Sequence, residues 1–369
     1  MKRKLTLILI FAVLLLSLLL PSCAQQEQTS QPSTPAASSP ATVEIIDMGG
    51  RTVTIPAPDK LERLYATGTH TDVFLYTLAP DKVTATPTTF DDEDKKFLSP
   101  LVYDLPNYGT LSGKGSLNFE AIKAGDVQVI LSGSTQTITQ SDIESADELQ
   151  AQLEIPVVLF NLDMDNFAES YELLGRMLGR EDDAKKLSDY CANIIETINA
   201  ISAQVPLEDR PTLYYAEGAD GLATEPAVSN RSIVFNKAGA INIAEVEALS
   251  GFGQASVSME QVLNWNPEVI IVQSGGAYDK IITDANWANI DAVKNGRVYE
   301  MPSIPYSWAD RPPSVNRFIG LYWMAYLLYP DLCDFDLIDV AQDYYKVMYH
   351  VDVSRGDIES LLVNSLPKK

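Results

Sequence analysis

The chain has 369 residues, with 50 Asp and Glu against 27 Lys and Arg, and a formal net charge of −23 at pH 7. Such an acidic surface would repel the phosphates of nucleic acid and does not suit a polybasic membrane-surface role, which excludes both classes. The length is sufficient for two domains.

Residues 1–23, MKRKLTLILIFAVLLLSLLLPSC, have the order of a secretory signal. Three basic residues precede an apolar run that extends to Leu20, and a small residue precedes Cys23. This junction resembles a bacterial lipobox, which implies that residues 1–22 are removed and that Cys23 becomes the lipidated first residue. An uncleaved transmembrane anchor is the alternative. Both interpretations place the rest of the chain outside the cytoplasmic membrane.

The segment that follows is predicted to be a tether, from residue 23 to 43. Residues 24–40 contain only Gln, Ser, Thr, Pro, Ala and Glu, and no large apolar side chain. Such a segment cannot bury enough surface to offset the entropy of ordering. A lipidated tether would keep a globular receptor close to a membrane partner and so raise its effective concentration.

A helix–turn–strand pattern occurs twice, around Glu120 and around Glu260. SLNFEAIKAGDVQVILSG covers residues 116–133, and SVSMEQVLNWNPEVIIVQSG covers residues 256–275. Each has a glutamate four residues after its first serine, then a short amphipathic helix, then an apolar strand. Continuous β-branched runs between turn residues are typical of strands that are buried on both faces in a parallel sheet. The repetition predicts two similar α/β lobes.

Two helices are predicted between these segments. Residues 165–178 form the first, which ends near Gly179, and Asp182 or Asp183 then caps a longer helix that extends to about Ala203. The apolar positions of the longer helix recur every three or four residues, at Leu187, Cys191, Ile194, Ile195, Ile198 and Ile201.

The predicted fold class is therefore α/β, with two similar lobes whose sheets are rich in parallel strands, joined by one long helix. The predicted divisions are a signal at 1–22, a lipidated tether at 23–43, an N-terminal lobe at 44–182, a connecting helix at 183–205 and a C-terminal lobe at 206–369. Cys191 and Cys333 have no spacing typical of a disulfide framework or a metal site, so they are either paired or free.

Six segments of the chain, in the order in which they occur, carry a resemblance to a known family. They are residues 47–68, 118–122, 174–187, 238–245, 257–262 and 344–362. Together they resemble the substrate-binding lipoproteins of ABC importers for iron–siderophore, haem and vitamin B12, in which a rigid helix joins two lobes. The resemblance covers essentially the whole mature chain.

The resemblance implies a partner and two docking residues. In this family one glutamate on each lobe docks onto arginines of the permease dimer, which works with its ATPase subunits, and the matching positions here are Glu120 and Glu260. Charge pairs of this kind fix register and accelerate encounter more than they add affinity. The alternative is that each acid only stabilises the first turn of its helix.

The resemblance also implies a ligand cleft between the lobes, lined by loops that leave the carboxyl ends of strands. The candidate ligand-binding residues are Thr69, His70, Tyr108 and Ser132 in the first lobe, and Tyr215, Arg231, Tyr306, Trp308 and Arg311 in the second.

Residues 305–314, PYSWADRPPS, are the most site-like segment of the chain. Tyr306 and Trp308 could stack on a ligand, and Arg311 could form a bidentate pair with an anion. The alternative is a packed loop in which Arg311 pairs with Asp310 or another acid. We assign Arg317 to the packing of the helix that follows.

The expected ligand is a chelated metal, most simply a ferric siderophore, haem or a corrinoid, and we expect no cofactor and no bare metal site. His70 and His350 are the only histidines, and a site for a bare transition metal needs more ligands of this type. An oxyanion such as molybdate or tungstate, or a nickel chelate, is the alternative for the same architecture.

A receptor is favoured over an enzyme. The sequence has no G-x-S-x-G, no H-E-x-x-H and no phosphate-binding glycine loop. A chelatase-like extracellular enzyme and a structural surface protein remain as alternatives from other classes. The prediction is a monomeric, extracytoplasmic, lipid-anchored solute receptor of an ABC importer.

Overall fold

The computed structural model describes residues 41–111, 115–247 and 254–368. All of these residues belong to one compact unit, which begins at Ser39. The predicted signal, the predicted lipidation site Cys23 and most of the predicted tether lie outside the described residues. Within the described ranges, no helix combines the length and the apolar character that a membrane span requires.

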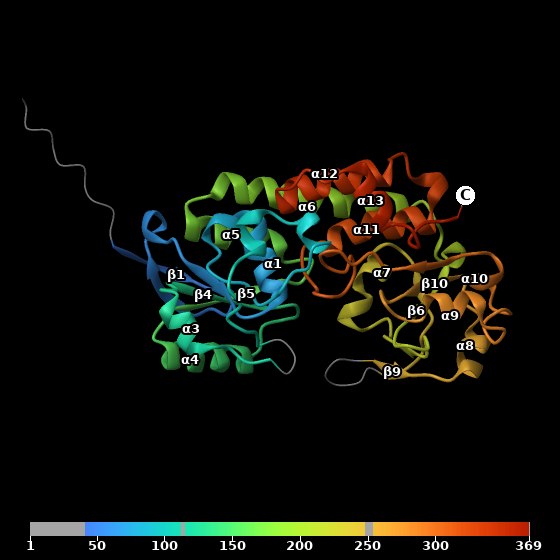
Figure 1. Cartoon of the computed structure of the whole chain (residues 1–369), viewed down its shortest axis with the longest axis horizontal. Coiled ribbons are helices and arrows are strands. Elements are labelled where there is room, and N and C mark those ends of the chain that lie inside the picture. The colour runs from blue at the N-terminus through green and yellow to red at the C-terminus, as the bar shows by residue number, and fades with distance from the viewer. Residues whose placement is uncertain (1–40, 112–114, 248–253, 369) are drawn as a thin grey trace, which may run out of the picture. The chain divides into compact units, whose positions relative to one another are not determined.

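Three parallel strands form the first sheet, in the order β3-β4-β5 (Figure 1). They are β3 (Leu64–Ala66), β4 (Val129–Ser134) and β5 (Val157–Asn161). Alternate residues of β5 belong to different hydrophobic clusters, one on each face of the sheet. Val157 and Leu159 pack with α3 (Phe119–Ala124) and α4 (Gln140–Leu153). Val158 and Phe160 pack on the other face, with α1 (Thr69–Leu78) and α5 (Phe167–Leu178). Both faces are covered, which explains the uninterrupted apolar sequence of these strands.

Four parallel strands form the second sheet, in the order β11-β10-β6-β8. They are β6 (Thr212–Ala216), β8 (Ile241–Asn242), β10 (Val269–Val272) and β11 (Val298–Glu300). Alternate residues of β10 again face different clusters: Ile270 and Val272 pack with α8 (Met259–Trp265), α9 (Tyr278–Thr283) and α10 (Asp291–Lys294). The other face packs against α7 (Ile233–Lys237) and α11 (Asn316–Leu328). We refer to the parts built on the two sheets as the first and second lobes.

The repeated sequence pattern corresponds to a repeated structural unit. In the first lobe α3 precedes β4, and in the second α8 precedes β10, and each of these strands has a parallel neighbour on both sides. Each helix is anchored by one fully buried residue at the same position, Ile122 or Val262. The predicted fold class is confirmed, whereas the predicted limits of the lobes stay predictions.

The two predicted helices between the lobes are present. The first is α5, whose C-cap is Gly179, with φ of 63°. The second is α6 (Glu181–Ser202), and six of its residues from the predicted apolar stripe are at least partly buried. The predicted cap is wrong: Arg180 is the N-cap, and Asp182 and Asp183 lie in the first turn, where acids favour the helix dipole.

Helix α6 is not the only connection between the lobes. It packs against α5 of the first lobe and α11 of the second. Helix α12 (Leu337–Tyr349), the second-last helix, also packs against α1 of the first lobe. There the Tyr76 hydroxyl donates to the Tyr349 carbonyl, and Nε2 of His350 lies 2.9 Å from the Thr77 carbonyl, to which it donates.

The remaining elements are short. The antiparallel pairs are β1 (Thr42–Ile46) with β2 (Thr52–Pro56) and β7 (Ala223–Thr224) with β9 (Ala255–Ser256), and the remaining α-helices are α2 (Pro100–Tyr103) and α13 (Arg355–Leu361). Strand β1 therefore includes the last two residues of the predicted tether, 42 and 43. Cys191 and Cys333 are both free thiols.

Candidate functional site

The carboxyl ends of the first sheet's strands lie against loops of the second lobe. The Ser314 hydroxyl donates to the His70 carbonyl over 2.7 Å, in the first turn of α1, which follows β3. The Asn230 side-chain amide donates to the carbonyl of Thr135, the residue after β4, over 2.8 Å. Ligands of open parallel sheets bind at this edge of the strands, so these loops define the candidate site.

Arg317 lies immediately behind these contacts and is fully buried, at 0% exposure. Its Nε donates to the Ala309 carbonyl over 3.1 Å, and its Nη2 donates to the carbonyl and the Oδ1 of Asn230 over 2.7 and 2.6 Å. Among the described residues, Nη1 has no hydrogen-bond partner. Burial lowers the pKa of Arg317 to about 10, against the opposing effect of Asp310 and Asp163, so the side chain stays charged at neutral pH.

A buried guanidinium that forms no ion pair with the described residues is unusual, because desolvation of an isolated charge is costly. Arg231, 86 residues earlier in the chain, shows the usual arrangement. Its Nη1 lies 2.9 Å from Oε1 of Glu225, a carboxylate with 1% side-chain exposure. The site therefore has one arginine that is neutralised within the protein and one, Arg317, whose charge is available to a bound anion.

Helix α1 contributes a second set of polar groups to this region. Thr71, in its first turn, is fully buried, and its hydroxyl has no partner among the described residues. Gly133 of β4 lies so close that a Cβ atom there would be 2.5 Å from this hydroxyl. Nε2 of His70 donates to the Gly133 carbonyl over 2.7 Å, and burial lowers the pKa of His70, so its ring stays neutral.

Arg311 belongs to a different, charge-compensated cluster. Its Nη2 donates to Oε1 of Glu217 over 2.6 Å, and its Nη1 donates to Asp310 and, over 3.0 Å, to the Tyr215 hydroxyl. Burial alone would lower the pKa of Arg311, but the charge of Asp310, with that of Glu217, raises it. Two carboxylates thus compensate this guanidinium, as the packed-loop alternative from the sequence anticipated. The ligand role predicted for Arg311 stays a prediction.

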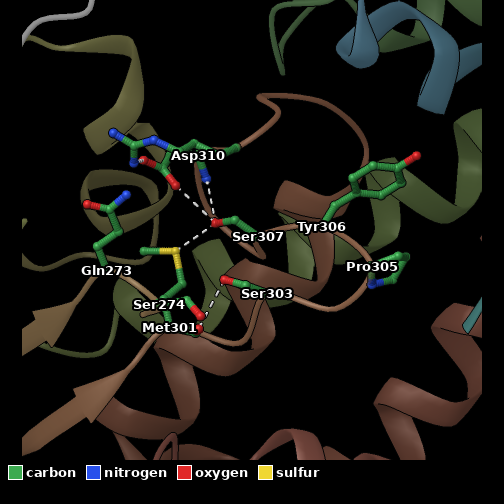
Figure 2. A pocket seen from close by; sticks show the side chains of 9 residues that line it. Gln273, Ser274, Met301, Ser303, Pro305, Tyr306, Ser307 and Asp310 are labelled. Atoms are coloured by element: carbon green, nitrogen blue, oxygen red, sulfur yellow. Dashed lines mark hydrogen bonds and ion pairs between the residues drawn. The ribbon is translucent and has the colours of Figure 1, made fainter. Parts of the chain in front are cut away.

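A pocket of about 260 Å³ lies beside this cluster, at the carboxyl ends of β10 and β11 (Figure 2). The Ser307 hydroxyl lies between Oδ1 of Asp310, at 2.9 Å, and the sulfur of Met301, at 2.8 Å. The residues that line the pocket are Gln273, Ser274, Met301, Ser303, Pro305, Tyr306, Ser307, Asp310 and Arg311.

The predicted aromatic residues have different environments. Tyr306 lines the pocket, and its ring packs edge-on against Phe90 of the first lobe, with centroids 6.1 Å apart. Trp308 is 1% exposed, and its indole nitrogen donates to the Tyr345 hydroxyl over 3.0 Å, so it packs in the core and has no free face for a ligand. Tyr215 is also fully buried, and its hydroxyl donates to Asp310 over 3.0 Å.

The other predicted first-lobe residues lie near α1. Thr69 is its first residue, and the Thr67 hydroxyl donates to that of Ser132 in β4 over 3.4 Å. Tyr108 lies farther away: it packs on Tyr65, with ring centroids 5.7 Å apart, next to the end of α3. The structure thus brings Thr69, His70 and Ser132 to one edge of the first sheet and places Tyr108 near the predicted docking helix.

Glu120 and Glu260 occupy equivalent positions. Each is exposed and is the second residue of its helix, after an N-cap side chain, Asn118 or Ser258, that accepts from the backbone N–H three residues later. Their helices differ one turn further on, where α3 has Lys123 and α8 has Leu263, which is 40% exposed.

Sequence reasoning missed Arg317 and Asn230. One signal was present: Arg317 is the second residue of an apolar helix, NRFIGLYWMAYLL, and has no acid three or four residues away on either side. No comparable signal marks Asn230. Among the described residues, no group of three or more His, Cys, Asp and Glu side chains is arranged to hold a metal ion.

The sequence profile of the periplasmic binding protein family matches residues 65–305. The molybdate-binding protein MolA of Haemophilus influenzae is 38% identical over 120 residues, which are 32% of this chain and 33% of that protein. The Fe(3+)-citrate-binding protein YfmC of Bacillus subtilis is 24% identical over 329 residues, 85% of this chain and 92% of that protein. A solved ABC transporter solute binding protein from Sulfurospirillum deleyianum is 28% identical, with a TM-score of 0.79 over 87% of this chain and 99% of that one.

Proposed function

The chain belongs to the periplasmic binding protein family of ABC-importer solute receptors, and from this premise we propose that its ligand is a compact anion bound at Arg317. The observation that carries the proposal is the charge of Arg317: the side chain is fully buried, its Nη1 has no partner among the described residues, and no ion pair with them neutralises it. An anion that enters between the lobes would supply the missing charge and the missing acceptor.

A tetrahedral oxyanion of the molybdate class is the first candidate. The relative with 38% identity over a third of its length is named a molybdate-binding protein. A small oxyanion needs a few charge-assisted donors in a dry site, and Arg317, the buried Thr71 hydroxyl and the start of α1 supply such donors close to the contact between the lobes.

A small anionic metal chelate is the second candidate. The relative that aligns over most of the chain is named an Fe(3+)-citrate-binding protein, and citrate carboxylates would pair with the same guanidinium. The larger chelates predicted from the sequence, ferric siderophore, haem and corrinoid, require a site that extends beyond these groups.

The delivery route is part of the same proposal. Cys23 carries the lipid anchor after cleavage of residues 1–22, and the monomeric receptor presents Glu120 and Glu260 to the permease dimer. The chain returns its ligand chemically unchanged, so it is a receptor and not an enzyme. Intact mass spectrometry of the protein from membranes tests the anchor: the expected mass is that of a chain that begins at a diacylated Cys23, and an unmodified or uncleaved chain would contradict it.

Titration calorimetry tests the ligand. The purified protein is titrated with molybdate, tungstate, ferric citrate, haem, cobalamin, nickel–histidine and a ferric hydroxamate, and we expect one-to-one binding of an oxyanion or of ferric citrate. Arg317→Met should weaken that binding by about 10- to 100-fold, the scale of a hydrogen bond to a charged group. Arg231→Met is the matched control and should change the dissociation constant by less than about threefold, because Glu225 already neutralises Arg231. Binding that survives Arg317→Met would reject this site.

A further inference from the structure

Asn230 is the residue that links Arg317 to the first lobe. Its carbonyl and its Oδ1 both accept from Nη2 of Arg317, over 2.7 and 2.6 Å. Its side-chain amide donates in the opposite direction, to the Thr135 carbonyl at the end of β4, over 2.8 Å. One short side chain therefore contacts both the buried charge and the loop that faces it from the other lobe.

The two acceptors on Asn230 fix the orientation of the guanidinium. With Nε held by the Ala309 carbonyl and Nη2 held twice by Asn230, the plane of the group is set, and Nη1 is the nitrogen left without a partner among the described residues. The acceptors are neutral oxygens, so they orient the charge without cancelling it. The neighbouring Arg231 provides the contrast, because the carboxylate of Glu225 holds and neutralises it.

The amide of Asn230 extends this arrangement across the lobe contact. Separation of the loops would break the Asn230–Thr135 hydrogen bond and free the side chain that orients Arg317. The nearby Ser314–His70 hydrogen bond also crosses between the lobes, over 2.7 Å. The Ser314 carbonyl accepts from the backbone N–H of Arg317 over 3.0 Å, but the Arg317 guanidinium donates to Ala309 and Asn230 and not to Ser314 among the described residues. Of these two cross-lobe contacts, the one made by Asn230 is therefore the one that is hydrogen-bonded to the guanidinium of Arg317.

We propose that Asn230 is the positioning residue of the anion site: it presents Arg317 with its charge intact, and it does so only while its amide is bound to the first lobe. This inference rests on the proposed function, because it assigns the anion to Arg317. It also explains why an amide and not a carboxylate is found here, since an aspartate would occupy the guanidinium in place of the ligand.

A stability cycle without ligand tests whether Asn230 holds the guanidinium of Arg317 without neutralising it. Thermal unfolding is compared for Asn230→Asp and Asn230→Ala, each with Arg317 present and with Arg317→Met. With Arg317 present, Asn230→Asp should have the higher midpoint, because its carboxylate pairs with a buried guanidinium. With Arg317→Met, the order should reverse, because the same carboxylate is then half-buried without its cationic partner. The same order in both backgrounds would overturn the inference.

Ligand binding, with molybdate and ferric citrate as the probes, tests whether Asn230 leaves the charge of Arg317 available to the anion. Asn230→Asp should be more stable than Asn230→Ala and yet bind the anion at least about tenfold more weakly than Asn230→Ala does. A purely structural role of Asn230 would not produce opposite orders of stability and affinity. Lys237→Ala is the control that removes another contact between the lobes, the 2.6 Å ion pair of Lys237 with Asp165, and it should bind within about threefold of the wild type. An Asn230→Asp protein that binds as well as Asn230→Ala would overturn the inference.

Failure of the proposed function gives a different pattern. If the wild type binds neither probe, or if Arg317→Met binds as the wild type does, the assignment of the anion to Arg317 is wrong. The stability cycle still reports whether Asn230 orients Arg317, because that measurement needs no ligand.

Discussion

Nη2 of Arg311 lies 2.6 Å from Oε1 of Glu217, a carboxylate that is completely buried and whose Oε2 has no partner among the described residues. Burial raises the pKa of Glu217, although Arg311 opposes that effect. With Asp310 on its other side, Arg311 compensates two acids in the interior of the second lobe.

Arg311→Met should therefore reduce stability more than affinity. Loss of one partner from a buried ion pair typically costs about 3–5 kcal/mol, because the remaining charge is left without compensation. Urea unfolding measures this loss, and Arg311→Met combined with Glu217→Gln should recover part of it. A variant that unfolds like the wild type but no longer binds its anion would instead support the ligand role predicted from the sequence.

Reversal of both predicted docking glutamates should abolish import and leave ligand binding intact. Glu120 and Glu260 are exposed, and neither contacts the Arg317 region, so Glu120→Lys with Glu260→Lys should change the dissociation constant by less than about threefold. Uptake of the bound anion into cells or proteoliposomes that contain the cognate importer is the measurement. Glu172→Lys is a suitable control, because Glu172 is an exposed acid on α5, away from both docking helices. Transport that survives the double reversal would reject the docking assignment.

The two predicted docking helices, α3 and α8, should not contribute equally. Lys123 lies one turn after Glu120 and would repel a basic permease surface, whereas Leu263 occupies the equivalent place after Glu260 and exposes an apolar side chain. Glu260→Lys alone should therefore impair uptake more than Glu120→Lys alone. Leu263→Lys should reduce uptake and Lys123→Leu should not. Equal effects of the two single reversals would show that the flanking residues are irrelevant.

Asp72 should make stability fall as the pH rises through the acid range. It is 5% exposed, Thr86 donates to its Oδ2 over 3.0 Å, and burial raises its pKa from 3.8 to about 7. Because the folded state holds this proton more tightly than the unfolded state, the folded protein is favoured at low pH and loses this advantage between about pH 4 and pH 7.

Asp72→Asn keeps an acceptor for Thr86 and removes the titration. Its free energy of unfolding, relative to that of the wild type, should increase by at most about 4 kcal/mol between pH 4 and pH 7, the scale of a pKa shift of this size. Above pH 7 the difference should level off. Urea unfolding at several pH values measures the difference. A difference that stays constant with pH would mean that Asp72 ionises in the folded state as it does in the unfolded chain.

The regular parts of the fold were predictable because their signals are local. The apolar runs that become β4 and β10 and the apolar stripe of α6 each lie within a short segment of sequence, where period and turn residues are sufficient. The cap of α6 was not predicted correctly, because several polar residues in succession could each begin the helix, and the backbone conformation selects Arg180.

The candidate site was less predictable because charge compensation is a tertiary property. Arg311 has an aromatic and proline-rich context, yet Glu217, which neutralises it, is 94 residues away in the sequence. Arg317 has the context of an ordinary helix residue, and only the folded chain shows that it is buried without an acid. The prediction that Trp308 stacks on a ligand has the same cause. The indole nitrogen of Trp308 donates to the Tyr345 hydroxyl, a partner that is distant in the sequence and that no local pattern indicates.

The packing of α12 on α1 has a consequence for biosynthesis. The hydrogen bonds between Tyr76 and Tyr349 and between Thr77 and His350 each join residues that are 273 positions apart in the sequence. A chain that emerges on the far side of a membrane with its N-terminus first would therefore expose the apolar face of α1 until almost the last residues had crossed. Chains shortened by about thirty residues would lack most of α12 and therefore this cover, so we expect the packing around α1 to be completed only late in export.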